Sequence, residues 1–194
     1  RGRGTFADAM RAATAAAERQ RWDDAVRELE RAKTLLPSYA GEDSPYRTLS
    51  QIHLTRGDTA GAIRELQAMT QRNELAYEAN LELDALAAAR GDVPAALAAL
   101  DRTLYISPFD LGIHQRLAER AARVGRHPVV IRERQAVLAL DPSDRVDAMY
   151  QLALAYANAG EVSAARREVL RALDLAPNFE KAQALLLSLQ EKRP

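Results

Sequence analysis

The sequence predicts an all-α fold in which about five helix-turn-helix repeats form an α-solenoid and a final helix caps the C-terminal end. Three observations lead to this prediction: a composition dominated by helix formers, glycines that recur at a fixed period, and prolines that recur in phase with them. A period of about 20–50 residues is typical of repeat proteins, so the period decides the architecture.

Composition alone favours helices. The 194-residue chain is rich in Ala, Leu, Arg and Glu, which form helices readily, and only 5% of its residues are aromatic. Residues that favour strands are correspondingly scarce. A chain of this length can bury about 70% of its unfolded surface, so we expect it to fold rather than stay disordered.

The period comes from glycine and proline. Four glycines recur at intervals of 34, 34 and 35 residues, and three prolines each follow a glycine by 17 residues: Gly57, Gly91, Gly125 and Gly160, with Pro108, Pro142 and Pro177. Glycine permits the positive φ angle that ends a helix, and proline prevents the next helix from continuing the previous one. Each period therefore predicts a helix, a tight turn, a second helix and a short link.

The repeat resembles that of the tetratricopeptide repeat (TPR) family. In residues 146–179 the small, aromatic and turn residues fall on family positions: Leu152, Ala153, Tyr156, Gly160, Ala165, Ala172 and Pro177. Earlier repeats keep the pattern with substitutions. Departures include Gln20 in place of a turn glycine, and Val130 and Arg134 in a second helix. The resemblance covers residues 6–179 and implies a right-handed superhelix of antiparallel helix pairs.

The resemblance also sets the expected boundaries. We expect a tail or linker, a degenerate first repeat, four further repeats and a capping helix, in that order: residues 1–5, 6–42, 43–76, 77–110, 111–145, 146–179 and 180–194. The capping helix is expected because the last repeat of an array needs a cover for its apolar face. The start at Arg1, with neither Met nor an apolar leader, suggests that the chain is a piece of a longer protein or a processed product.

Several function classes are disfavoured. The chain has 27 Lys and Arg against 27 Asp and Glu, so it lacks the basic excess of nucleic-acid binders. It has no cysteine and no apolar run of 18 residues, and its three histidines form no His-Glu-x-x-His motif. Phosphate-loop and nucleophile-elbow motifs are also absent. We therefore expect no enzyme activity, cofactor, metal ion, nucleic-acid partner or membrane insertion.

The resemblance implies a concave groove, lined by the first helix of each repeat, that binds partners. The corresponding positions are Arg47, Gln51, Leu54, Leu81, Ala85, Gln115, Glu119, Arg123, Tyr150, Leu154 and Asn158. They lack the family's Lys/Asn clamp for C-terminal carboxylates, so we do not expect binding of chaperone tails. Small, apolar and scattered polar residues suit an apolar-faced helix or an extended segment.

The expected function is that of a non-enzymatic scaffold whose groove binds a peptide, a helix or a partner domain. Two alternatives stay open. The array could be the C-terminal module of a larger bacterial enzyme, such as a zinc-peptidase-like envelope protein, with an upstream domain of the same chain as its partner. It could instead be a structural solenoid that self-assembles through an apolar end face containing Ala12, Ala13, Ala16 and Ala17. The Arg- and Ala-rich composition favours a bacterial origin.

Overall fold

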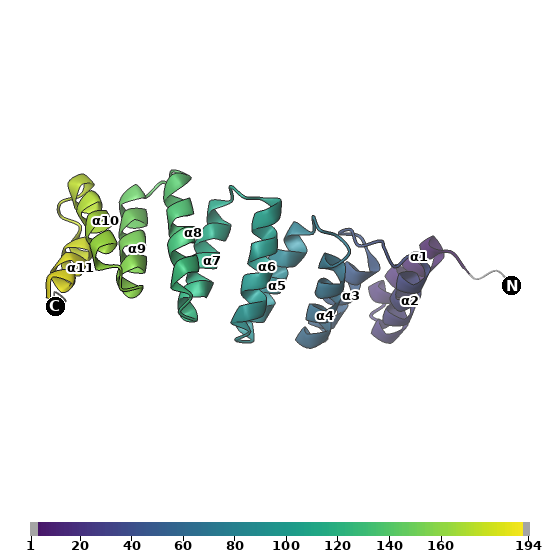
Figure 1. Ribbon diagram of the computed structural model, residues 1–194. Helices are drawn as coiled ribbons and strands as arrows, with labels where there is room; N and C mark the ends of the chain where they lie inside the picture. Colours follow the sequence, from purple (N-terminus) through teal and green to yellow (C-terminus); the bar gives the residue numbers. More distant parts are fainter. Residues whose placement is uncertain (1–3, 192–194) are drawn as a thin grey trace. The chain divides into compact units, whose positions relative to one another are not determined.

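The computed structural model describes residues 4–191 (Figure 1). This part of the chain contains eleven helices and no strand, which confirms the predicted all-α class. The helices divide into two compact units, one ending at Ile106 and the other starting at Ser107.

The first unit consists of three helix pairs, each with a tight turn between its two helices (Figure 1). Its helices are α1 (Phe6–Glu18), α2 (Trp22–Leu35), α3 (Pro45–Thr55), α4 (Thr59–Thr70), α5 (Tyr77–Ala89) and α6 (Val93–Ile106). Each second helix packs against its own first helix and against the first helix that follows within the unit. A residue's place in its repeat therefore determines which neighbours it meets.

The second unit consists of two helix pairs and a final helix. Its helices are α7 (Leu111–Arg123), α8 (His127–Ala139), α9 (Arg145–Asn158), α10 (Val162–Leu175) and α11 (Glu180–Glu191). Helix α11 packs against α10 and α9, where Ala182 and Leu189 join a cluster with Ala165 and Val169. The helix expected as a cap thus covers the apolar side of the last pair. Residues 192–194 of that expected segment lie outside the described residues.

Close packing within each pair depends on a small residue in the second helix. The residue five positions after the turn is Ala25, Ala62, Ala96 or Ala165 in four of the pairs, and each of these has 0% exposure. Val130 occupies this position in α8 and is also buried. Small side chains here let the two helices approach closely, which is why the sequence needs alanine at this period.

The turn between the helices of each pair requires a left-handed backbone residue. Gly57, Gly91, Gly125 and Gly160 have φ angles from 67° to 79°, and Gln20 takes the same place in the first pair with φ 57°. A Cβ atom added at any of the four glycines would meet no other atom within 4 Å. The preference for glycine there is therefore conformational and does not come from crowding.

A buried polar contact joins α7 to α8. The Nδ1 atom of His114 lies 2.6 Å from Oε2 of Glu133, and its Nε2 atom lies 3.0 Å from the carbonyl oxygen of Pro108. Both side chains are buried. Because both ring nitrogens face oxygen atoms, the ring has a fixed orientation between the two helices and the preceding link.

We expect the substitution Gln20→Gly to raise the free energy of unfolding by about 1 kcal/mol, and Gly125→Gln to lower it by about the same amount. A side chain at a left-handed position costs about 1–2 kcal/mol, which the greater unfolded-state entropy of glycine partly offsets. Urea unfolding followed by far-UV circular dichroism measures both changes. Gln71→Gly is the matched control: Gln71 has φ −71°, so glycine should destabilise the protein there. Destabilisation by Gln20→Gly would contradict the argument.

Candidate partner-binding surface

The eleven residues predicted to bind a partner all lie on first helices. They occupy α3 (Arg47, Gln51, Leu54), α5 (Leu81, Ala85), α7 (Gln115, Glu119, Arg123) and α9 (Tyr150, Leu154, Asn158). Spacings of three or four residues place each helix's set on one face. None of the eleven is buried, and Gln51, Ala85, Glu119, Arg123 and Asn158 are exposed. We call the first five residues the α3–α5 face and the other six the α7–α9 face.

On the α3–α5 face, Arg47 is already engaged within the protein. Its guanidinium donates to Glu82 of α5, and its Nε atom lies 3.2 Å from Oε2 of Glu42. The side chain of Arg47 is mostly buried by these contacts. Arg47 therefore links α3 to α5, a role that the sequence did not indicate.

A polar cleft of about 210 Å³ adjoins the α7–α9 face at Gln115. Gln115 is the predicted residue that lines it, together with Arg134 of α8 and with Asp147 and Gln151 of α9. The Nε2 atom of Gln151 lies 3.5 Å from Oδ2 of Asp147. Amide and charged groups from three helices thus meet in one concavity, although only Gln115 was among the predicted residues.

Arg134 stands at a position that is apolar in the other repeats. The residue nine positions after the turn is elsewhere Leu29, Leu66, Leu100 or Val169, each with 0% exposure. Burial lowers the pKa of Arg134, and the nearby carboxylates of Glu119 and Asp147 partly oppose that shift. No direct ion pair of Arg134 occurs within residues 4–191. The sequence did indicate that this residue is unusual, because Arg134 departs from the apolar pattern of the other repeats.

Tyr150 packs against the segment that precedes α11. Its ring meets the ring of Phe179 edge to face, with centroids 5.5 Å apart and planes at 82°. This contact fixes the Tyr150 ring on one side and leaves the side chain half-buried. Tyr150 therefore forms a rigid border of the α7–α9 face.

No family model matches the chain, and no curated protein matches it. Solved structures do. MamA from Desulfovibrio magneticus RS-1, from residue 41 to its end, is 24% identical with a TM-score of 0.55, over 76% of this chain and 82% of that one. YrrB, described as a TPR protein with an unusual peptide-binding site, is 17% identical with a TM-score of 0.56, over 89% of this chain and 87% of YrrB. The TPR domain of P58(IPK) is 15% identical with a TM-score of 0.52, over 96% of this chain and 64% of that domain. The fold is the tetratricopeptide repeat fold.

Within this TPR fold, all eleven predicted residues come from the first helix of a pair. Among the residues described in this TPR array, His, Asp and Glu side chains form no group of three or more that could hold a metal ion. Over the same residues, no helix combines the length and apolarity needed to cross a membrane.

We expect Arg134→Leu to stabilise the TPR array by about 1 kcal/mol, since it removes a partly desolvated cation and buries apolar surface instead. Urea unfolding of the variant and the parent protein measures the change. The control is Arg167→Leu on exposed α10 surface, which should change stability by less than about 0.5 kcal/mol. A marked loss of stability in Arg134→Leu would mean that Glu119 and Asp147 stabilise the cation by more than burial costs it.

Proposed function

We propose that this chain is a protein-interaction scaffold whose α3–α5 face and α7–α9 face each bind a peptide segment of a partner protein. The observation that carries the proposal is that none of the eleven first-helix residues is buried, in a fold built almost entirely of packed helices. Large accessible helix faces without catalytic groups are suited to binding another chain. YrrB, which has this fold, is itself described as having a peptide-binding site.

The α7–α9 face supplies the polar part of the proposed site. The amides of Gln115 and Gln151 can each donate and accept hydrogen bonds, as the backbone of an extended peptide requires. Arg134 adds a cation at a position where Leu or Val would give a better core. Keeping a charge there at a cost in stability is expected of a residue that contacts a ligand.

Apolar contacts come from leucines spread over both faces. Leu54, Leu81 and Leu154 are half-exposed and lie among polar neighbours. An amphipathic helix or an extended segment with apolar side chains at intervals matches this pattern. Net charge near zero argues against a surface that depends on phosphate contacts.

The self-assembly alternative has less support at the N-terminal end. Ala13 and Ala16, which were expected on the apolar end face, are buried in a core cluster with α2 and α3 residues. Only Ala12 and Ala17 of that group retain accessible surface. We therefore favour a peptide segment over another copy of the chain as the partner.

Peptides selected from a random phage-displayed library against the full chain provide the test. The dissociation constant of a selected peptide is measured by isothermal titration calorimetry for the parent protein and for Leu81→Glu combined with Leu154→Arg. We expect at least a tenfold weaker affinity, about 1.4 kcal/mol, because charges replace an apolar contact on each face. Far-UV circular dichroism should be unchanged, since neither leucine is buried.

The matched control is Leu187→Glu, which changes an exposed leucine of α11 that lies on neither face. This variant should bind the peptide like the parent protein. Equal affinities for the double variant and the parent would contradict the proposed site.

A further inference from the structure

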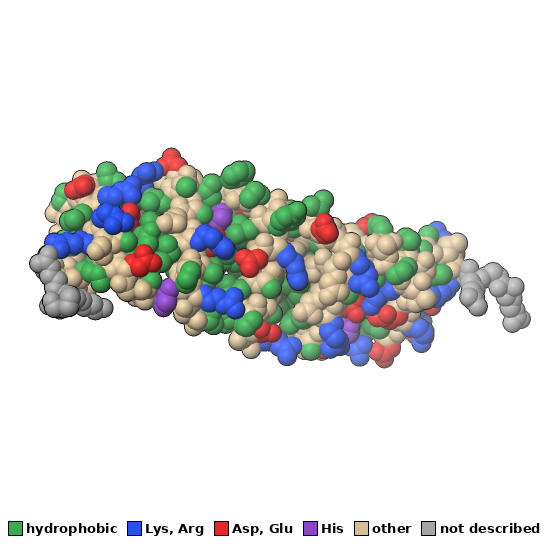
Figure 2. Space-filling view, viewed as in Figure 1, with side chains coloured by type: hydrophobic (Ala, Val, Ile, Leu, Met, Phe, Trp, Pro, Cys, Tyr) green, Lys and Arg blue, Asp and Glu red, His purple; other side chains and the backbone are tan. Residues whose placement is uncertain are grey.

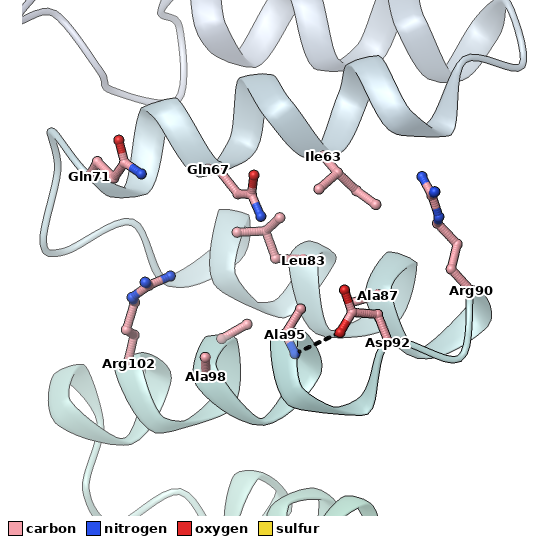
Figure 3. A pocket seen from close by; sticks show the side chains of 11 residues that line it. Ile63, Gln67, Gln71, Leu83, Ala87, Arg90, Asp92, Ala95, Ala98 and Arg102 are labelled. Atoms are coloured by element: carbon pink, nitrogen blue, oxygen red, sulfur yellow. Dashed lines mark hydrogen bonds between the residues drawn. The ribbon is translucent and has the colours of Figure 1, made fainter.

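A second concavity lies between the second helices α4 and α6 of the first unit, with α5 behind it (Figure 3). Its volume is about 480 Å³. Ile63, Gln67 and Gln71 form the α4 wall, Ala98, Ala99 and Arg102 are on the α6 wall, and Leu83 and Ala87 form the floor. None of the eleven first-helix residues lines it. This α4–α6 cleft is thus separate from the proposed peptide faces.

The cleft occurs where the third repeat departs from the others. In four repeats, the seventh and eighth residues after the turn are Arg and Glu: Arg27-Glu28, Arg64-Glu65, Arg132-Glu133 and Arg167-Glu168. In the third repeat the same positions are Ala98 and Ala99. Two long side chains are therefore missing from one wall of the cleft.

The equivalent position in the second unit, between α8 and α10, shows what such a space normally contains. The hydroxyl oxygen of Tyr156 accepts a hydrogen bond of 2.7 Å from Nε2 of Gln135. Nη1 of Arg171 donates to both carboxylate oxygens of Glu168, at 2.8 and 3.1 Å. An aromatic ring with an acceptor oxygen and a carboxylate thus satisfy the polar groups of the two walls, and a smaller concavity of about 320 Å³ remains between them.

In the first unit, the neighbouring space between α2 and α4 is closed in a related way. Nζ of Lys33 lies 2.9 and 3.0 Å from the two carboxylate oxygens of Glu65, the glutamate of the Arg-Glu pair in that repeat. The side chains of both residues are largely buried there. A carboxylate paired with a cation therefore occurs both between α2 and α4 and beside the α8–α10 space.

The α4–α6 cleft has the polar side chains of the two walls but lacks the tyrosine and glutamate that pair with them in the second unit. Gln67 corresponds to Gln135 and Arg102 to Arg171, but Ala87 replaces Tyr156 and Ala99 replaces Glu168. The side chains of Gln67 and Arg102 make no hydrogen bond or ion pair within the described part of the chain. Figure 3 shows them directed into the cleft from opposite walls, with Leu83 between them.

The remaining charges of the cleft favour an anion. Arg90 lies at the end of the cleft away from Arg102, and it too has no ion pair among the described residues (Figure 3). The Asp92 carboxylate accepts a hydrogen bond of 3.1 Å from the backbone N–H of Ala95. Asp92 therefore caps the N-terminus of α6, where the helix dipole stabilises its negative charge. Two arginines thus face one capped carboxylate.

We propose that the α4–α6 cleft binds a segment of a partner protein in which an acidic residue is adjacent to a tyrosine. The tyrosine ring packs on Leu83 and Ala87, and its hydroxyl oxygen accepts a hydrogen bond from the Gln67 amide. The acidic side chain pairs with Arg102. The partner segment thereby supplies the two side chains that Tyr156 and Glu168 supply within the second unit.

The capped peptide acetyl-Ala-Glu-Tyr-Ala-amide tests the proposal by NMR titration of the full ¹⁵N-labelled chain. We expect saturable shifts at the Gln67 side-chain amide and the Arg102 Nε–H, and at the backbone amides of Ala87 and Ala99. The signals of Gln135 and Arg171, which already have hydrogen-bond partners within the protein, should not move. Shifts centred on Gln115 and Gln151, or no saturable shift, would overturn the proposal.

Matched peptides separate the two contacts. Replacing Glu by Gln in the peptide removes the charge and keeps the shape, and replacing Tyr by Ala removes the ring. Each change should weaken binding about fivefold or more, because a charge-assisted hydrogen bond or a buried ring is lost. Equal binding of all three peptides would overturn the proposal.

Tyrosine amide and 4-hydroxyphenylpropionate alone should bind more weakly than the peptide. Equal binding of 4-hydroxyphenylpropionate would assign the cleft to a small aromatic acid instead.

Variants of the protein complete the test. Arg102→Gln should weaken binding of the Glu-Tyr peptide about tenfold with an unchanged melting temperature. Arg171→Gln, at the equivalent position, should leave affinity unchanged because Arg171 is already paired with Glu168. Ala87→Tyr combined with Ala99→Glu should fill the cleft from within and abolish binding. Because that double variant can overpack the core, Arg102→Gln decides the outcome. Parent-like affinity of Arg102→Gln would overturn the proposal.

Discussion

Every helix pair of this protein depends on one backbone residue that is held at a positive φ angle between its two helices. Four of these residues are glycines and the fifth is Gln20. The turn folds the second helix back onto the first, and its recurrence every 34 or 35 residues from Gly57 onwards places equivalent side chains in equivalent surroundings. This regularity is what makes a departure in one repeat meaningful, because the other repeats show what the same position does when the pattern is kept.

The fold could be predicted from the sequence because its signals are local. Glycine and proline mark the ends of helices whatever the neighbouring repeats contain, and alanine at a fixed distance from the turn marks close packing. The predicted first-helix residues are also placed correctly on helix faces, since a spacing of three or four residues is enough to define a face. Whether these residues bind a partner is a separate question that periodicity does not answer.

The rest depends on contacts between residues that are distant in the sequence. Nothing in the sequence near Arg47 indicates that Glu82, one repeat later, holds its guanidinium. The α4–α6 cleft could not be predicted from the sequence either, since Ala87 and Ala99 are ordinary helix formers and Gln67 lies in the preceding repeat. Arg134 was the exception, because an arginine at an otherwise apolar position is visible in the sequence. On the face drawn in Figure 2, acidic and basic side chains are intermingled, in keeping with the balanced composition.

The alanines of the third repeat tie recognition to packing. Ala87 and Ala99 line the α4–α6 cleft and are themselves buried in the first unit. A larger side chain at either position narrows the cleft and also has to be accommodated by the neighbouring core. Tyr156 and Glu168 occupy these positions in the second unit, where a smaller concavity of about 320 Å³ remains. An array of this kind can therefore change the shape of the cleft in one repeat without changing its length.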